Sequence, residues 1–158
     1  RGGVRGGRLP HGFGETRYQH ALAPGRNTGA KTNNMRGIPD VGMEASARPG
    51  VRVYDGGSWF IVGGTSVSSP TFAAVVAIAD QVNGAPLGFL NDALYKIGND
   101  PTRYANDFFD VTTGNNDQFK SPQDPNYAAT PGWDPVTGRG TPNAANLLRD
   151  LIASGHGT

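Results

Sequence analysis

The pattern of apolar and polar positions predicts a β-hairpin in the first half of the chain. Val-Arg-Val-Tyr at 51–54 and Trp-Phe-Ile-Val at 59–62 are rich in β-branched and aromatic residues, which favour strands. Asp55, Gly56 and Gly57 separate the two runs, and such residues are typical of the turn between paired strands. Gly63 and Gly64 then end the second strand.

A helix is predicted from Thr71 to Gln81, shortly after these glycines. Apolar side chains fall on most of its faces, at Phe72, Val75, Val76, Ile78, Ala79 and Val82. A helix that is apolar on most faces is expected to be buried. Ser66 would then be held at the start of a rigid element.

Two further helices are expected. Leu90 opens a short one that runs through Lys96, with Asn91 as its N-cap, and Asn143 caps the last helix. The last helix carries an apolar stripe of Leu147, Leu148, Leu151 and Ile152. Residues 1–37 and 98–142 are rich in turn signals and are expected to be irregular. A short strand entry is expected at 38–41.

Composition limits the fold class. The 158 residues suit one domain or a large piece of one, and 24 glycines with 12 prolines favour a loop-rich α/β or β-rich protein. The longest apolar run, at 72–79, is far shorter than the about 20 residues that span a bilayer. The absence of cysteine excludes disulfides and thiolate metal sites. Because the chain opens on Arg1 with no signal peptide in view, we expect a processed or excerpted piece.

The net charge of +1 conceals an asymmetry. Residues 1–52 hold nine basic residues against three acidic ones, whereas residues 53–158 hold five against ten. An acidic partner explains the basic half better than a nucleic acid does, because the basic residues are scattered and lack interleaved aromatic residues. RNA binding through the Arg/Gly-rich residues 1–8 is an alternative with only two or three repeats behind it.

Ser66 is the candidate nucleophile. The preceding glycines permit a sharp turn, and a helix N-terminus offers free N–H groups and the positive end of the dipole. Equally, a serine or threonine before a helix is often only a cap. A nucleophile also requires a base. His156 lies in a His-Gly-Thr tripeptide like the one around the catalytic histidine of subtilisins. In subtilisins that tripeptide opens a helix, which residues 156–158 are too few to form, so a catalytic role of His156 is not expected. The other candidates are His11, His20, Glu15 and Glu44.

Residues 110–117 resemble a calcium loop in composition. They fail the EF-hand pattern, because Asn115 stands where glycine is required and Ser121 where a bidentate glutamate is required. Composition alone therefore favours a solvated acidic turn. A hard cation bound by oxygens from two separated loops stays open as an alternative.

Taken together, several segments resemble the sedolisin family of serine-carboxyl peptidases. They follow one another in the family's order over roughly residues 17–150, at 36–41, 62–70, 87–95, 109–116 and 131–142. Subtilisins share only the Gly-Thr-Ser-x-x-x-Pro element of 64–70. The Pro-Gly-Trp-Asp-Pro segment at 131–135 separates the two families.

The resemblance implies an α/β fold, a subtilisin-like doubly wound parallel sheet, with Ser66 as the nucleophile. In sedolisins a glutamate oriented by an aspartate is the base, and a second aspartate helps the serine N–H bind the oxyanion. A glutamate base, with a reference pKa near 4.3, stays usable in acid. We therefore expect an acid-active, secreted endopeptidase or tripeptidyl-peptidase that takes peptide or protein substrates.

The resemblance also implies one structural calcium ion. Asp110 and Asp134 would supply carboxylate oxygens, while Val111, Thr130 and Gly132 would supply backbone carbonyls. Water would complete a shell of about six oxygens. The position of Thr130 is more often glycine in the family, a change that a carbonyl ligand tolerates.

This chain departs from the family in one respect. The three catalytic carboxylates lie upstream of the family segment that corresponds to residue 1, and Glu15 and Glu44 match none of them. Residues 1–158 are thus expected to be the C-terminal part of one catalytic domain, with 1–37 irregular and 38–154 carrying the nucleophile helix, calcium region and final helix. The chain alone should be inactive and need the N-terminal part as partner, with no nucleic acid and no membrane. The alternatives are a non-catalytic module that binds peptide or calcium, and a subtilisin-type protease fragment.

Overall fold

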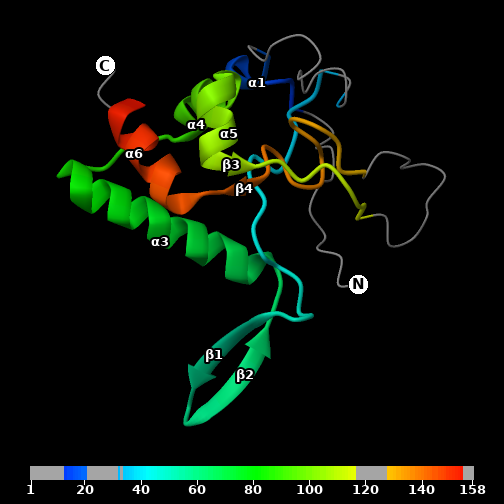
Figure 1. The fold of residues 1–158 in the computed structure, drawn as a ribbon, viewed down its shortest axis with the longest axis vertical. Coiled ribbons are helices and arrows are strands. Elements are labelled where there is room, and N and C mark those ends of the chain that lie inside the picture. Colours follow the sequence, from blue (N-terminus) through cyan, green and yellow to red (C-terminus); the bar gives the residue numbers. More distant parts are fainter. Residues whose placement is uncertain (1–12, 21–31, 33, 117–127, 155–158) are drawn as a thin grey trace.

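The computed structural model describes residues 13–20, 32, 34–116 and 128–154, and it combines helices with short strands (Figure 1). The helices are α1 (Arg17–His20), α3 (Thr65–Asn83), α4 (Asn91–Asn99), α5 (Pro101–Asp107) and α6 (Ala144–Ser154). The strands are β1 (Val51–Asp55), β2 (Ser58–Val62), β3 (Phe108–Phe109) and β4 (Thr141–Pro142).

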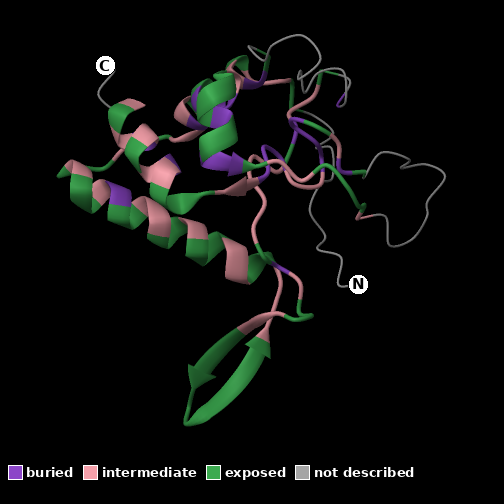
Figure 2. Ribbon diagram, viewed as in Figure 1, coloured by how far each residue is buried: buried purple, intermediate pink, exposed green. Residues whose placement is uncertain are grey.

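The predicted hairpin is confirmed. Strands β1 and β2 pair antiparallel with Asp55 opposite Ser58, so Gly56 and Gly57 form a two-residue turn. Both glycines have positive φ, 55° and 82°, as the turn that best matches strand twist requires. The hairpin extends away from the helices and is exposed on both faces (Figures 1 and 2).

Helix α3 differs from the prediction in its start and in its burial. It begins at Thr65, so Ser66 lies inside its first turn and Pro70 lies within the helix. The expectation of a buried helix was wrong: Ala79 is its one fully buried residue, and Ile78 and Val82 are 51% and 66% exposed. The helix packs mainly on α6, which covers one face and leaves the others open in the described part of the chain (Figure 2).

The core lies where α4, α5 and α6 meet the loop before β4. Its buried members are mostly large and apolar: Leu94, Tyr95, Ile97, Tyr104, Phe108, Trp133, Leu147 and Leu151. The stripe predicted for the last helix is thus confirmed, since Leu147 and Leu151 are buried and Leu148 and Ile152 are half-buried. The indole of Trp133 is fully buried and donates a hydrogen bond to the carbonyl of Pro39, 3.0 Å away.

Helix α5 was not predicted. Asp100 forms its N-cap and accepts hydrogen bonds from the backbone N–H groups of Thr102 and Arg103, while Pro101 takes the first helical position. That arrangement is a common helix start, which sequence analysis interpreted as a turn. In α4 the predicted cap was wrong, because Leu90 is the N-cap and the Asn91 side chain donates instead to Asp40.

The described residues contain two antiparallel sheets of two strands each, β1–β2 and β3–β4. The fold is therefore mixed helix and strand, consistent with the α/β class. Within the described ranges no parallel strand pair is found, and the doubly wound sheet stays a prediction for the longer protein. No helix in the described part of the chain is long and apolar enough to cross a membrane.

A carboxyl pair between α5 and α6, in which Asp107 is buried and Asp150 half-buried, predicts a pH-dependent stability. Burial, together with the adjacent, hydrogen-bonded Asp150, raises the pKa of Asp107 to about 6, against a smaller lowering by the Arg103 guanidinium. Because the folded state holds this proton more tightly, its contribution is complete below the ordinary pKa of 3.8 and is lost as pH rises through 6.

Asp107→Asn should remove this contribution, which amounts to at most about 3 kcal/mol. Urea unfolding at pH 4 and pH 7 should show a smaller difference in free energy of unfolding for the variant than for the wild type. An unchanged difference would rule out the pair as its source.

Candidate functional site

The turn before α3 can be built only with glycine. Gly64, the residue before the helix, has φ 106° and ψ 162°, a conformation open essentially to glycine. At Gly63 a Cβ atom would lie 2.5 Å from the backbone nitrogen of Ala47, so the backbone at Gly63 passes in close contact with the backbone at residues 46–47. These glycines bring the chain sharply from β2 into α3 and leave Ser66 exposed in the first turn.

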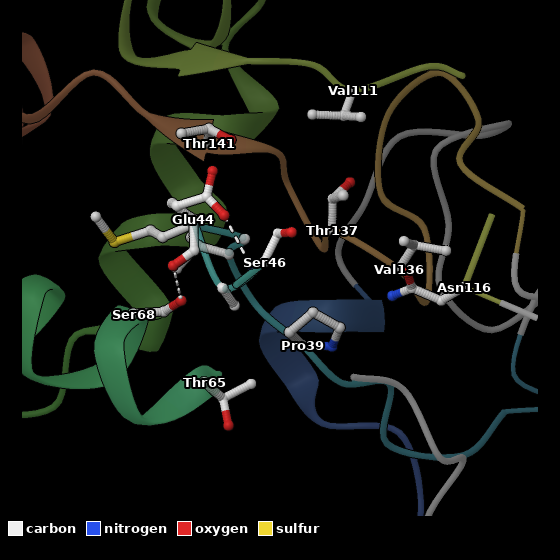
Figure 3. Close-up of a pocket in the computed structure, with 14 residues that line it drawn as sticks. Pro39, Glu44, Ser46, Thr65, Ser68, Val111, Asn116, Val136, Thr137 and Thr141 are labelled. Atoms are coloured by element: carbon white, nitrogen blue, oxygen red, sulfur yellow. Dashed lines mark hydrogen bonds between the residues drawn. The ribbon is translucent and has the colours of Figure 1, made fainter. Parts of the chain in front are cut away.

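The turn is attached to the loop segment 44–47. The Gly64 N–H donates to the carbonyl of Ala45 at 2.6 Å, and the Ser68 hydroxyl donates to the carbonyl of Glu44 at 2.8 Å (Figure 3). Glu44, Ser68 and Thr65 also line an open pocket of about 490 Å³ beside the helix start. Val111 lies on another wall of this pocket.

No hydrogen bond joins the Ser66 hydroxyl to an acidic residue or a histidine in the described part of the chain. The Glu44 carboxylate accepts from the N–H of Ser46 at 2.6 Å, and Glu15 is paired with the Nδ1 of His20 at 3.1 Å. His11, His156, Ser121 and the Arg/Gly-rich residues 1–8 lie outside the described residues.

The five predicted calcium ligands come together in two neighbouring loops. The Gly132 N–H donates to Oδ2 of Asp110 at 2.8 Å, and the Thr130 N–H donates to Oδ2 of Asp134 at 3.1 Å. Val111 follows Asp110 directly. Asp134 is fully buried and also accepts from the N–H groups of Val136 and Thr137, each at 2.8 Å, so its carboxylate organises the whole loop.

This arrangement fits a hard cation. Oδ1 of Asp110 is buried and has no hydrogen-bond partner among the described residues, which is costly unless something else binds it. Carboxylate and carbonyl oxygens are the ligands that calcium prefers. No group of three or more acidic or histidine side chains suited to a metal occurs in the described ranges, so any ion here would depend on backbone carbonyls as well.

A polar network that was not predicted surrounds Asp40. Its carboxylate accepts from Arg36, from Asn91 at 2.8 Å and from the Tyr95 hydroxyl at 2.8 Å, and Gln19 donates to that hydroxyl. Burial raises the pKa of Tyr95, and the Asp40 carboxylate raises it further, so the phenol stays a donor. The network joins α1, residues 36–40 and α4; the i,i+4 spacing of Arg36 and Asp40 was its one signal in the sequence.

Comparisons with known proteins agree on one group of peptidases. Kumamolisin of Bacillus sp. (strain MN-32) is 39% identical over 155 residues, which cover 97% of this chain and 26% of kumamolisin. Aorsin of Aspergillus oryzae is 36% identical over 136 residues (84% and 19%), and tripeptidyl-peptidase 1 of Mus musculus is 35% identical over 130 residues (72% and 22%). The chain thus spans about a quarter of the length of these relatives or less. No protein-family model matches it.

Proposed function

The chain belongs to the sedolisin family of serine-carboxyl peptidases, and from this we propose that it is the C-terminal part of an acid-active peptidase domain with Ser66 as nucleophile. The observation that carries the proposal is the exposed Ser66 in the first turn of α3, behind a glycine turn that is attached to segment 44–47. The protein would act on peptides or proteins, as an endopeptidase or tripeptidyl-peptidase, and would be secreted.

In this mechanism the Oγ of Ser66 attacks the scissile carbonyl and forms an acyl-enzyme, which water then hydrolyses. The N–H of Ser66 is one of the free donors of the first helical turn, so it is suited to stabilise the oxyanion. The serine proton would pass to a glutamate in the upstream part of the domain. That base would stay ionised and usable in acid, where a histidine would be protonated.

We also propose one structural calcium ion. The carboxylates of Asp110 and Asp134 with the carbonyls of Val111, Thr130 and Gly132 would hold it, and the unpartnered Oδ1 of Asp110 supports this. The ion would neutralise the two carboxylates and fix the two loops against each other. Its contribution would be to stability, because Ser66 lies on a different element.

The upstream part of the domain would be the partner of this chain. The exposed apolar side chains of α3, including Ile78 and Val82, and those of the β1–β2 hairpin, including Trp59 and Phe60, are the surface that such a part would cover. This also accounts for a helix that is apolar on most faces yet exposed in the described structure.

The proposal predicts that activity requires both parts. Residues 1–158 alone should not cleave a peptide at about pH 4, near the reference pKa of a glutamate, and mixing or co-refolding them with the upstream segment should restore cleavage. Peptide hydrolysis followed by mass spectrometry would measure both. Activity of the chain alone would contradict the missing base, and a folded but inactive reconstituted domain would favour a non-catalytic peptidase-like module. Loss of activity on replacing a histidine would favour a subtilisin-type enzyme.

A further inference from the structure

The first turn of α3 is attached to segment 44–47 on both sides of Ser66. Two residues before it, the backbone N–H of Gly64 donates to the carbonyl of Ala45. Two residues after it, the Ser68 hydroxyl donates to the carbonyl of Glu44 (Figure 3). The consecutive carbonyls of Glu44 and Ala45 therefore hold the chain two residues before and two residues after the nucleophile.

The helix itself supplies little to fix this turn. Its N-cap is Gly64, which has no side chain to bond the free N–H groups. Pro70 lies four residues after Ser66 and has no N–H, so the Ser66 carbonyl lacks its ordinary helical donor. Apart from the backbone bond from the Val67 N–H to the Gly64 carbonyl, contacts from outside the helix therefore help to limit the movement of the first turn.

Among the hydroxyl side chains at 65–71, that of Ser68 is the one found to donate to another segment in the described part of the chain. The Thr71 hydroxyl donates within the helix, to the carbonyl of Val67 at 2.7 Å. Ser69 is exposed, and no hydrogen bond of its side chain is found among the described residues. The carbonyl that Ser68 binds belongs to Glu44, whose carboxylate in turn holds the N–H of Ser46 and stiffens the segment.

We infer that Ser68 is a positioning residue for the nucleophile: its hydrogen bond to segment 44–47 holds the Oγ and N–H of Ser66 where the acylation transition state requires them. This rests on the proposed function of Ser66. A small displacement of a nucleophile lowers its rate steeply, because the reacting atoms must be held in the geometry of attack.

The test uses the full-length protein with a peptide substrate. Ser68→Ala should lower kcat about tenfold, which corresponds to about 1.4 kcal/mol in activation free energy, while KM stays within about twofold. Ser68→Thr keeps the hydroxyl and should recover most of kcat. Ser69→Ala, the same atomic change one residue further along, should match the wild type. The melting temperature of each variant separates lost positioning from lost stability.

Three outcomes would overturn the role of Ser68: a wild-type kcat in Ser68→Ala, an equal loss in Ser69→Ala, or no recovery in Ser68→Thr. The Ser66→Ala variant, assayed in parallel, distinguishes this from a failure of the proposed function. If Ser66→Ala is inactive and Ser68→Ala is normal, the positioning role alone fails. If Ser66→Ala is fully active, both fail.

Discussion

Replacing Ser66 by alanine in the full-length protein should abolish peptide cleavage in acid, with a loss of at least about a thousandfold in kcat. The removed oxygen is the atom that would form the acyl-enzyme, and no other group can replace it in that step. Ser66 is exposed and lies in a turn fixed by backbone contacts, so its hydroxyl contributes little to stability. The variant should therefore keep the melting temperature of the wild type.

The measurement is the rate of hydrolysis of a peptide across acid pH, with mass spectrometry to detect the acyl-enzyme at Ser66. Ser69→Ala is the matched control, because it removes the same atom from an exposed position in the same helix. Wild-type cleavage by Ser66→Ala would refute the assignment. Equal losses in both variants would indicate damage to the helix start instead.

The local elements were predictable where short-range rules decide them. The hairpin follows from two apolar runs and the pair Gly56–Gly57, which demand a tight turn wherever the strands lie. The last helix follows from its apolar stripe, because Leu147 and Leu151 face one core. Helix α3 begins at Thr65, earlier than the predicted start at Thr71, because the glycine turn directly before it allows the chain to enter the helix there.

What could not be predicted depends on contacts between distant segments. The exposure of α3 is set by which elements pack on it, and periodicity does not contain that information. In the Asp40 network, one carboxylate binds Asn91 and Tyr95, which lie 51 and 55 positions further along the chain. The ligands proposed for calcium were found through a family resemblance, and the structure brings their two loops together through Gly132 and Asp110.

Asp134→Ala should destabilise the protein strongly even without calcium. The side chain is fully buried and accepts from the backbone N–H groups of Thr130, Val136 and Thr137 and from the Thr137 hydroxyl. Its removal would leave several half-buried donors unsatisfied and a cavity at a fully buried position, a loss of about 3–5 kcal/mol in free energy of unfolding. Chemical denaturation in the presence of a chelator would measure this. A loss below about 1 kcal/mol would contradict the organising role of this carboxylate.

The effect of calcium on stability should distinguish the roles of Asp110 and Asp134, the two carboxylates that we propose as its ligands. In the wild type, calcium at a hundred times its Kd should add about 2.7 kcal/mol of stability, and a chelator should remove it. Asp110→Asn should abolish this gain while costing less in chelator than Asp134→Ala, because the Asp110 carboxylate accepts from Gly132 alone among the described residues and its Oδ1 is unpartnered. Asp55→Asn, an exposed carboxylate on β1, should keep the full gain. A gain that survives in Asp110→Asn would place the ion elsewhere, and no gain in the wild type would remove the calcium proposal.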